Sequence, residues 1–290
     1  MGRLTTTVAV LAGAGAFALL ASGCGERREP TGTSAPTVYP VTVQGANDHP
    51  LVIAVAPRRV LPVSPAAAAI VDALGRRELV PGAPATGRLR PFPVRAVAST
   101  PADLVVGSQM NDANALQAAA ADASTPLLIL ADNSIRDLTQ SILELGLAIG
   151  VPMQARALVA TIDAKRAEVR AKLKGVAPVT VFVDTGYTIP IADDTFAGEL
   201  LREAGATNIA GNADATPFPI KDLLAAEPAF YLATEASGTK LEDLRKTRRL
   251  RSLAAVREGR FAIIPLSLLQ PSPDIGEAID QLYAILHPAP

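Results

Sequence analysis

The sequence predicts an α/β protein with two Rossmann-like lobes, each built on a mostly parallel sheet, joined by one long backbone α-helix. Short apolar, strand-like runs alternate with helical segments along most of the 290 residues, which is the pattern of βαβ units. A longer helical stretch interrupts this alternation at residues 153–174, and a second α/β set follows it. A chain of this length suits two lobes of ordinary domain size better than one small core.

Composition places the chain among folded globular proteins and gives no sign of nucleic-acid binding. Hydrophobic residues make up 49 % and charged residues 19 % of the sequence, and the formal net charge is −1. The one basic run, residues 245–251, has acids beside it and no interleaved aromatic residues. We therefore interpret it as a solvated helix end and loop.

The first lobe is predicted over residues 39–152. Apolar runs bounded by turn residues predict strands, and apolar residues at helical spacing predict helices. The first helix has a well-defined start, because Ser64 is a typical N-cap and Pro65 suits the first turn, while Gly75 can end it. The predicted strands are 41–43, 51–53, 59–63, 79–80, 102–108 and 126–130, and the predicted helices are 66–74, 114–123 and 134–149.

The second lobe is predicted over residues 175–290, after the connecting helix. Its strands and helices alternate, and glycine or proline follows most of the helices. The predicted strands are 179–183, 229–232 and 261–265, and the predicted helices are 195–204, 219–226, 250–257 and 275–286.

The first 23 residues predict a signal peptide. Arg3 supplies a short basic region, and residues 8–20 form an uncharged apolar stretch that is short for a membrane span. Small residues then precede Cys24, which is the only cysteine, so neither an intramolecular disulfide nor a cysteine-based metal site can form.

The segment before Cys24 resembles the lipobox of bacterial lipoproteins, although Leu20 stands one place further from the cysteine than is usual. The resemblance implies lipidation of Cys24 and an exported, membrane-anchored protein, with residues 24–38 as a polar tether. The alternative is an ordinary secretory leader that is cleaved near Gly23.

Four segments, in order, resemble the class III periplasmic binding proteins, the helical-backbone family that includes iron-siderophore and vitamin B12 binders. They are residues 58–75, 101–107 with the sequence PADLVVG, 196–208, and 255–265 with the sequence AVREGRFAIIP. The resemblance implies a bilobal protein with limited hinge motion. It also implies a small-molecule ligand held between the lobes and an ABC permease as the partner.

Candidate ligand-binding residues follow from the position of the predicted strand ends. In parallel α/β sheets the ligand crevice lies outside the carboxyl ends of the strands. Each loop at such a strand end can equally be an ordinary surface loop. Ser64 in particular can act as a helix cap and nothing more. Arg88 and Arg90 can pair with an anionic ligand or stay solvated. The candidates are Ser64, Pro65, Arg88, Arg90, Ser108, Gln109, Asn111, Thr185, Tyr187, Glu235 and Gln270.

The class of ligand is constrained by which residue types are scarce. Only two histidines occur, His49 and His287, and neither falls in a predicted cleft loop, so we expect no bare zinc or manganese site and no cofactor. A haem would need an axial ligand, for which Tyr187 is the candidate. Tryptophan is absent and aromatic residues are few. This favours a ferric siderophore or related iron chelate, with haem or cobalamin (a corrinoid) as alternatives.

Two other classes of function compete with the importer component. An enzyme is disfavoured, because the sequence has no nucleophile elbow, no glycine-rich phosphate loop and no histidine placed as a base. The acid pair Asp193-Asp194 is better explained by the start of the following helix. A lipoprotein adaptor without import function is the second alternative. The family resemblance implies an exposed glutamate on each lobe for permease docking, but Asp222 stands at the second-lobe position and no glutamate occurs between residues 81 and 126.

Overall fold

A computed structural model describes residues 37–46, 50–214 and 216–288. The predicted signal peptide, Cys24, His49 and almost all of the predicted tether lie outside these ranges. The boundaries proposed for the tether and the two lobes therefore stay predictions. Below, the first lobe denotes the described residues before helix α4 (Pro152–Lys172), and the second lobe denotes those after it.

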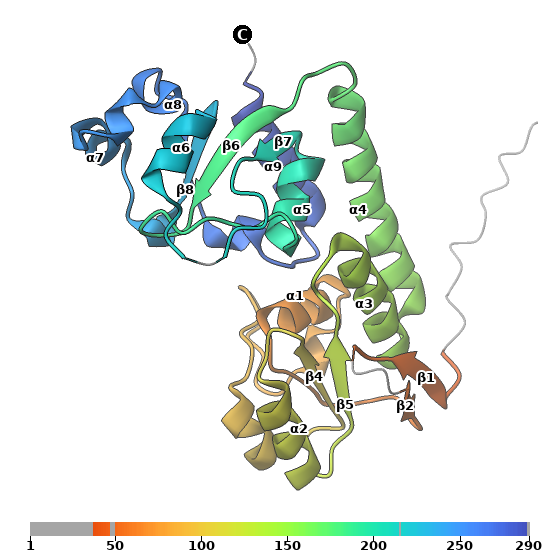
Figure 1. The fold of residues 1–290 in the computed structure, drawn as a ribbon. Helices are drawn as coiled ribbons and strands as arrows, with labels where there is room; N and C mark the ends of the chain where they lie inside the picture. The colour runs from red at the N-terminus through yellow and green to blue at the C-terminus, as the bar shows by residue number, and fades with distance from the viewer. Residues whose placement is uncertain (1–36, 47–49, 215, 289–290) are drawn as a thin grey trace, which may run out of the picture. The chain divides into compact units, whose positions relative to one another are not determined.

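Each lobe is built on a parallel sheet, which confirms the predicted fold class (Figure 1). The first lobe has the strand order β3-β4-β5 and the second lobe has β7-β6-β8-β9, with every pair parallel. The strands are β3 (Val60–Pro62), β4 (Leu104–Ser108), β5 (Leu127–Leu130), β6 (Val179–Asp184), β7 (Ala206–Asn208), β8 (Phe230–Thr234) and β9 (Phe261–Ile264).

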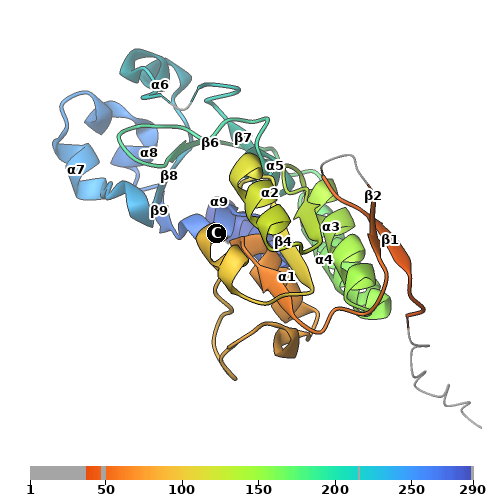
Figure 2. The ribbon, with the colours of Figure 1, turned by 90° about the horizontal axis from the view of Figure 1, so that it is seen from below.

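Helices cover these sheets and connect their strands. In the first lobe they are α1 (Pro65–Ala73), α2 (Ala113–Asp122) and α3 (Ile135–Ala148). In the second lobe they are α5 (Phe196–Glu203), α6 (Ile220–Ala226), α7 (Leu241–Lys246), α8 (Ala254–Arg257) and α9 (Ile275–Leu286). A short antiparallel pair, β1 (Val41–Gln44) and β2 (Pro50–Ile53), lies beside α3 (Figure 2).

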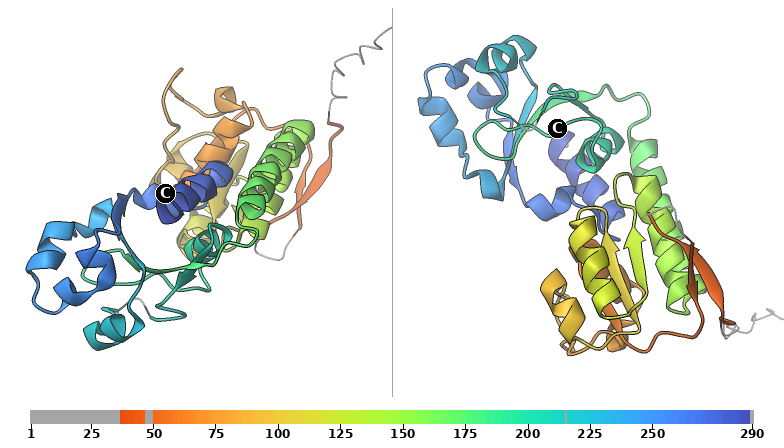
Figure 3. Two further views of the ribbon diagram at one scale, coloured as in Figure 1. Left: turned by 90° about the horizontal axis from the view of Figure 1, so that it is seen from above. Right: turned by 60° about the horizontal axis from the view of Figure 1, so that its bottom comes forward.

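The long helix α4 packs against α3 of the first lobe and α9 of the second (Figure 3). Its buried residues Ala155, Ile162 and Val169 recur every seventh position and so form one narrow stripe along the helix. The stripe belongs to a single hydrophobic core that also includes residues from both sheets. The predicted connecting helix therefore contributes to the core of both lobes.

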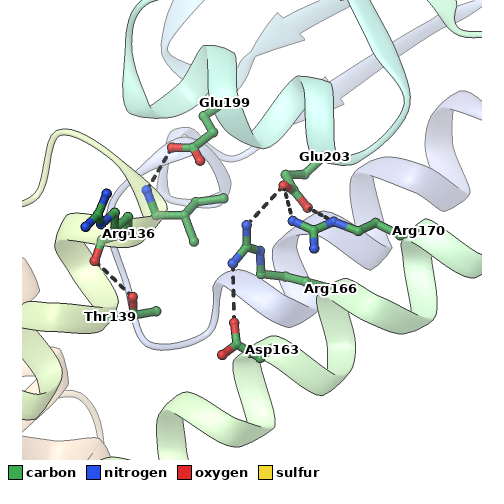
Figure 4. A network of polar contacts seen from close by, with 8 residues as sticks. Arg136, Thr139, Asp163, Arg166, Arg170, Glu199 and Glu203 are labelled. Carbon is green, nitrogen blue, oxygen red and sulfur yellow. Dashed lines mark hydrogen bonds and ion pairs between the residues drawn. The ribbon is translucent and has the colours of Figure 1, made fainter.

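Polar contacts add to this packing around α5 (Figure 4). Arg166 and Arg170 of α4 donate to the Glu203 carboxylate at 3.0 and 2.6 Å. Burial opposes ionisation of Glu203, but the hydrogen bonds from Arg170 and Arg166 outweigh it and lower the pKa of this carboxyl. Glu199, one turn earlier on α5, accepts a 2.8 Å hydrogen bond from the backbone N–H of Ile135, at the start of α3. Helix α5 is thereby linked to both α3 and α4.

Two predicted elements differ in the structure. Residues 79–80 are not a strand: Leu79 ends a short 3₁₀ helix, η1 (Arg77–Leu79), and both side chains are buried in the core without strand partners. The predicted helix 250–257 is divided into the 3₁₀ helix η4 (Leu250–Ser252) and α8, because Leu253 between them is extended. Leu253 is 1 % exposed, so its burial overrides local helix propensity.

Helices α3 and α4 approach so closely that Gly146 has no room for a side chain, since a Cβ there would overlap the side chain of Ala155. We expect Gly146→Ala to lower stability by about 1–3 kcal/mol, the usual effect of overpacking. At a helix position with room for a methyl group, replacing glycine by alanine usually raises stability. Denaturant unfolding checks this, and an unchanged or higher midpoint would contradict the close packing.

Candidate ligand-binding cleft

A cavity of about 760 Å³ opens between the two lobes, which lies within the usual range for small-molecule sites. One wall comes from the first lobe, through α1 and the loop that carries Arg88. The other comes from residues 265–274 and the first turns of α9. Three predicted ligand-binding residues, Pro65, Arg88 and Gln270, line this cavity although they are far apart in the sequence.

The loop that carries Arg88 is held in place by Arg77. The Arg77 guanidinium binds both oxygens of Asp72, at 2.8 and 2.6 Å, and donates to the carbonyls of Pro84 and Gly87 at 2.9 and 2.6 Å. Asp72 itself lines the cavity, and this pairing neutralises its charge. Among the described residues Arg88 has no ion-pair partner, so its guanidinium is available to a ligand.

A smaller cavity of about 300 Å³ lies against the same loop, and both Arg88 and Arg90 line it. Arg90 does not line the larger cavity. The structure therefore places the two predicted arginines near each other but brings only Arg88 to the space between the lobes.

Three of the predicted first-lobe residues, Ser64, Ser108 and Asn111, do not line the cavity but make hydrogen bonds at the ends of β3 and β4. The Ser64 hydroxyl accepts from the Ala67 N–H at 3.1 Å and caps α1. The Asn111 side chain accepts from the Ser108 N–H at 2.9 Å and donates to the Val63 carbonyl at 3.2 Å, which joins the ends of β3 and β4. Ser64 and Ser108 are buried and do not line the cavity, so their predicted contact with a ligand stays a prediction.

The remaining predicted residues lie at strand ends but outside the cavity lining. Gln109 is exposed and accepts a 2.9 Å hydrogen bond from Asn133. Thr185 follows β6 and donates to the Ile189 carbonyl. Tyr187 is 91 % exposed, and Glu235 is exposed just after β8.

Sequence reasoning missed Asp132, which follows β5 at the same edge of the first-lobe sheet as Ser108. It is 3 % exposed, and neither carboxylate oxygen accepts a hydrogen bond of good geometry. Burial raises the pKa of Asp132 and the charge of Asp137 adds to this, while the nearby Ser108 hydroxyl and Gln109 amide offset part of it. An acid placed directly after the apolar run 127–130 was the signal available in the sequence.

The described ranges show neither a metal centre nor a membrane-spanning helix. Nowhere in them do three or more His, Cys, Asp or Glu side chains gather closely enough to hold a metal ion. No helix in these ranges has the length and hydrophobicity that a membrane crossing needs. His287, at the end of α9, stacks on Tyr283 and does not line the cavity.

A family model described as "Periplasmic binding protein" matches residues 93–268, which is more than half of the chain. The match covers most of the first-lobe sheet and continues to the segment after β9. No curated protein sequence matches the chain.

Solved structures share the fold at low sequence identity. The periplasmic heme-binding protein RhuT from Roseiflexus sp. RS-1 is 22 % identical, with a TM-score of 0.68 over 79 % of this chain and 98 % of that one. Helicobacter pylori CeuE, solved as a nickel–histidine complex, is 14 % identical, with a TM-score of 0.71 over 86 % and 88 %. An ABC transporter substrate-binding protein from Listeria monocytogenes EGD-e is 16 % identical, with a TM-score of 0.67 over 81 % and 100 %.

The raised pKa of Asp132 predicts the sign of a pH effect on stability. The folded protein binds the Asp132 proton more tightly than the unfolded chain does. The resulting stability is present below the unfolded-state pKa and is lost as the pH rises through the folded-state pKa. We therefore expect Asp132→Asn to raise the unfolding midpoint at neutral pH and to lose this advantage in acid. Denaturant titrations at both pH values test this, with the exposed Asp194→Asn as the control; a lower midpoint at neutral pH would contradict it.

Proposed function

Since the chain belongs to the periplasmic binding protein family, we propose that it captures a small metal chelate outside the cytoplasm and delivers it to an ABC importer. Family membership confirms the resemblance to class III binding proteins and the expectation that the protein is not an enzyme. It is a substrate-binding protein, and what remains to be proposed is its ligand, its anchoring and its docking.

The observation that carries the proposal is the cavity between the lobes. Pro65, Arg88 and Gln270 come from three separate segments, were candidates from the sequence, and line one space of about 760 Å³. The guanidinium of Arg88, side-chain amides, hydroxyl groups and the carboxylates of Asp274 and Glu277 line that space, which suits a polar ligand.

We propose a ferric siderophore or related iron chelate as the ligand. RhuT is a heme-binding protein and CeuE was solved with nickel and histidine, so structural relatives hold metal-centred ligands. No aromatic side chain is among the described residues that line the larger cavity, and this disfavours stacking on a haem or corrin ring. Arg88 can neutralise a carboxylate or other anionic group on the chelate.

Docking and anchoring complete the proposal. Asp222 is exposed in the first turn of α6, where it can face a basic permease surface. The lack of a glutamate between residues 81 and 126 favours the lipoprotein adaptor as the second candidate function. In either case we propose that Cys24 carries the lipid anchor and holds the protein at the outer face of a bacterial membrane.

The first prediction concerns Arg88. A ligand that binds only the folded protein raises stability by about 2.7 kcal/mol at a hundredfold excess over its dissociation constant, so thermal shift can identify it among ferric citrate, ferric trihydroxamates, haemin and cobalamin. For a chelate that binds, Arg88→Ala should weaken affinity roughly tenfold to hundredfold, because a charged hydrogen bond contributes about 1.5–3 kcal/mol.

Arg95→Ala is the matched control, since Arg95 is an exposed arginine on the same segment that lines neither cavity. Equal losses in the two variants would place the ligand elsewhere. A folded protein that binds none of the four ligand classes would favour the adaptor.

The second prediction concerns Cys24. If the thiol is acylated, cells grown with a labelled fatty acid should label the protein, which should fractionate with membranes. Cys24→Ser should abolish the label and release the protein, because the variant has no thiol to carry the lipid. Labelling that persists in the variant, or its absence in the parent, would favour the ordinary secretory leader.

A further inference from the structure

Asp184, the last residue of β6, is the centre of a buried hydrogen-bond network. It is 1 % exposed. One carboxylate oxygen accepts from the backbone N–H groups of Gly186 and Thr188, at 2.9 and 3.0 Å. The other accepts from the hydroxyl groups of Tyr231 and Thr239, at 3.0 and 2.8 Å. Four donors account for the carboxylate's full hydrogen-bonding capacity, so the buried charge is well compensated.

The loop that Asp184 holds has an unfavourable backbone. Gly186, Tyr187 and Thr188 have φ values of +141°, +54° and +61°. The last two are costly for residues with a side chain, and most of all for a β-branched threonine. Such conformations persist only where surrounding contacts impose them, and they concentrate at ligand-binding and catalytic sites. Here the two amide bonds to Asp184 impose the conformation.

The strained loop displays an aromatic side chain. Tyr187 is 91 % exposed, so no packing of its side chain offsets the cost of the strained backbone. On either side, Thr185 and Ile189 close the loop with a 2.9 Å backbone hydrogen bond, and the Thr188 carbonyl accepts from Phe218 at 2.9 Å. The base of the loop is therefore fixed and its tip is free.

The position of this loop in the sheet points to a ligand. From β6 the chain moves to β7 on one side, and from β8 it moves to β9 on the other. The point where connections diverge is where open α/β sheets form their ligand crevice, at the carboxyl ends of the strands. Asp184 ends β6, and Thr239 lies in the segment that follows β8. The network therefore joins the loops that follow the two strands on either side of this point.

We propose that Asp184 is a positioning residue, which locks the loops after β6 and β8 together and so presents Tyr187, outside the lining of the larger cavity, to a part of the ligand that extends beyond that cavity. This rests on the proposed function, since it requires a ligand in the cleft. The Tyr187 ring offers a surface for the carbon skeleton of a chelate, and its hydroxyl offers a donor to an outward-facing oxygen. Burial and the charge of Asp184 raise the pKa of Tyr231, which keeps that hydroxyl a donor to the network.

Conformational locking can be measured directly, because the sequence contains no tryptophan. Tyr187→Trp creates a single fluorescent reporter at the tip of the loop. In that background we expect Asp184→Ala to lower the fluorescence anisotropy while the far-UV circular dichroism stays folded. Asp184→Asn keeps an oxygen for the two amide donors and should restore much of the anisotropy. Unchanged anisotropy in the alanine variant would overturn the locking.

The action through Tyr187 is tested by a double-mutant cycle with ferric citrate and a ferric trihydroxamate as the probes. In the otherwise unsubstituted full chain, Asp184→Ala should weaken binding roughly tenfold, a typical coupling for residues in one network. In a Tyr187→Ala background the same change should have little further effect. A merely structural role would give equal losses in both backgrounds and would overturn the inference.

Asn208→Ala is the matched control for general loss of stability. Asn208 is 6 % exposed at the end of β7, where its side chain donates to the Ile191 carbonyl at 2.7 Å and does not contact the Asp184 network. It should lower the unfolding midpoint without changing affinity. Failure of both probes to bind the unsubstituted protein would overturn the proposed ligand class and this inference with it, whereas binding without coupling would overturn the inference alone.

Discussion

The burial of α4 against one helix from each lobe is the constraint on which the rest of the structure depends. Only a thin stripe of α4 is fully buried, with Ala155, Ile162 and Val169 at seven-residue intervals, while Leu158 and Val159 are partly buried against the same core. A stripe so narrow buries enough surface only if the neighbouring helices come very close. Glycines make this approach feasible, because Gly146 of α3 faces Ala155, and Gly276 of α9 faces Lys165 and Ile162. The lobes are thus fixed to a common helix by small residues rather than by large side chains.

Contacts of two carboxylates then set the orientation of α5 against α3 and α4. Removing a charge from water is costly, so a part-buried ion pair adds orientation more than stability. Glu203 satisfies this principle by accepting from two arginines of α4, while Glu199 takes up an otherwise unpaired N–H at the start of α3. Because both acids lie on one face of α5, that helix has a single orientation that satisfies them.

The sequence allowed the main elements to be predicted where local pattern and burial agree. The helix around 275–286 and the cap at Ser64 were found because apolar spacing and capping chemistry are local. The helix predicted over residues 250–257 was wrong in part, because Leu253 is buried in a non-helical conformation that interrupts it. In the site, three of the candidates, Pro65, Arg88 and Gln270, line the cavity, although the segment before Arg88 is a 3₁₀ helix and not the predicted strand. Strand ends could not identify Asp184 as a positioning residue, because its partners Tyr231 and Thr239 lie 47 and 55 residues further along the chain.

In each lobe a buried or part-buried charged side chain fixes one loop through hydrogen bonds, and the two charges are opposite in sign. In the first lobe a cation, Arg77, binds Asp72 and two loop carbonyls and holds the segment that carries Arg88. In the second lobe an anion, Asp184, binds two loop amides and two hydroxyl groups under Tyr187. Each loop is ordered before a ligand arrives, so the entropy of ordering these loops does not weaken binding.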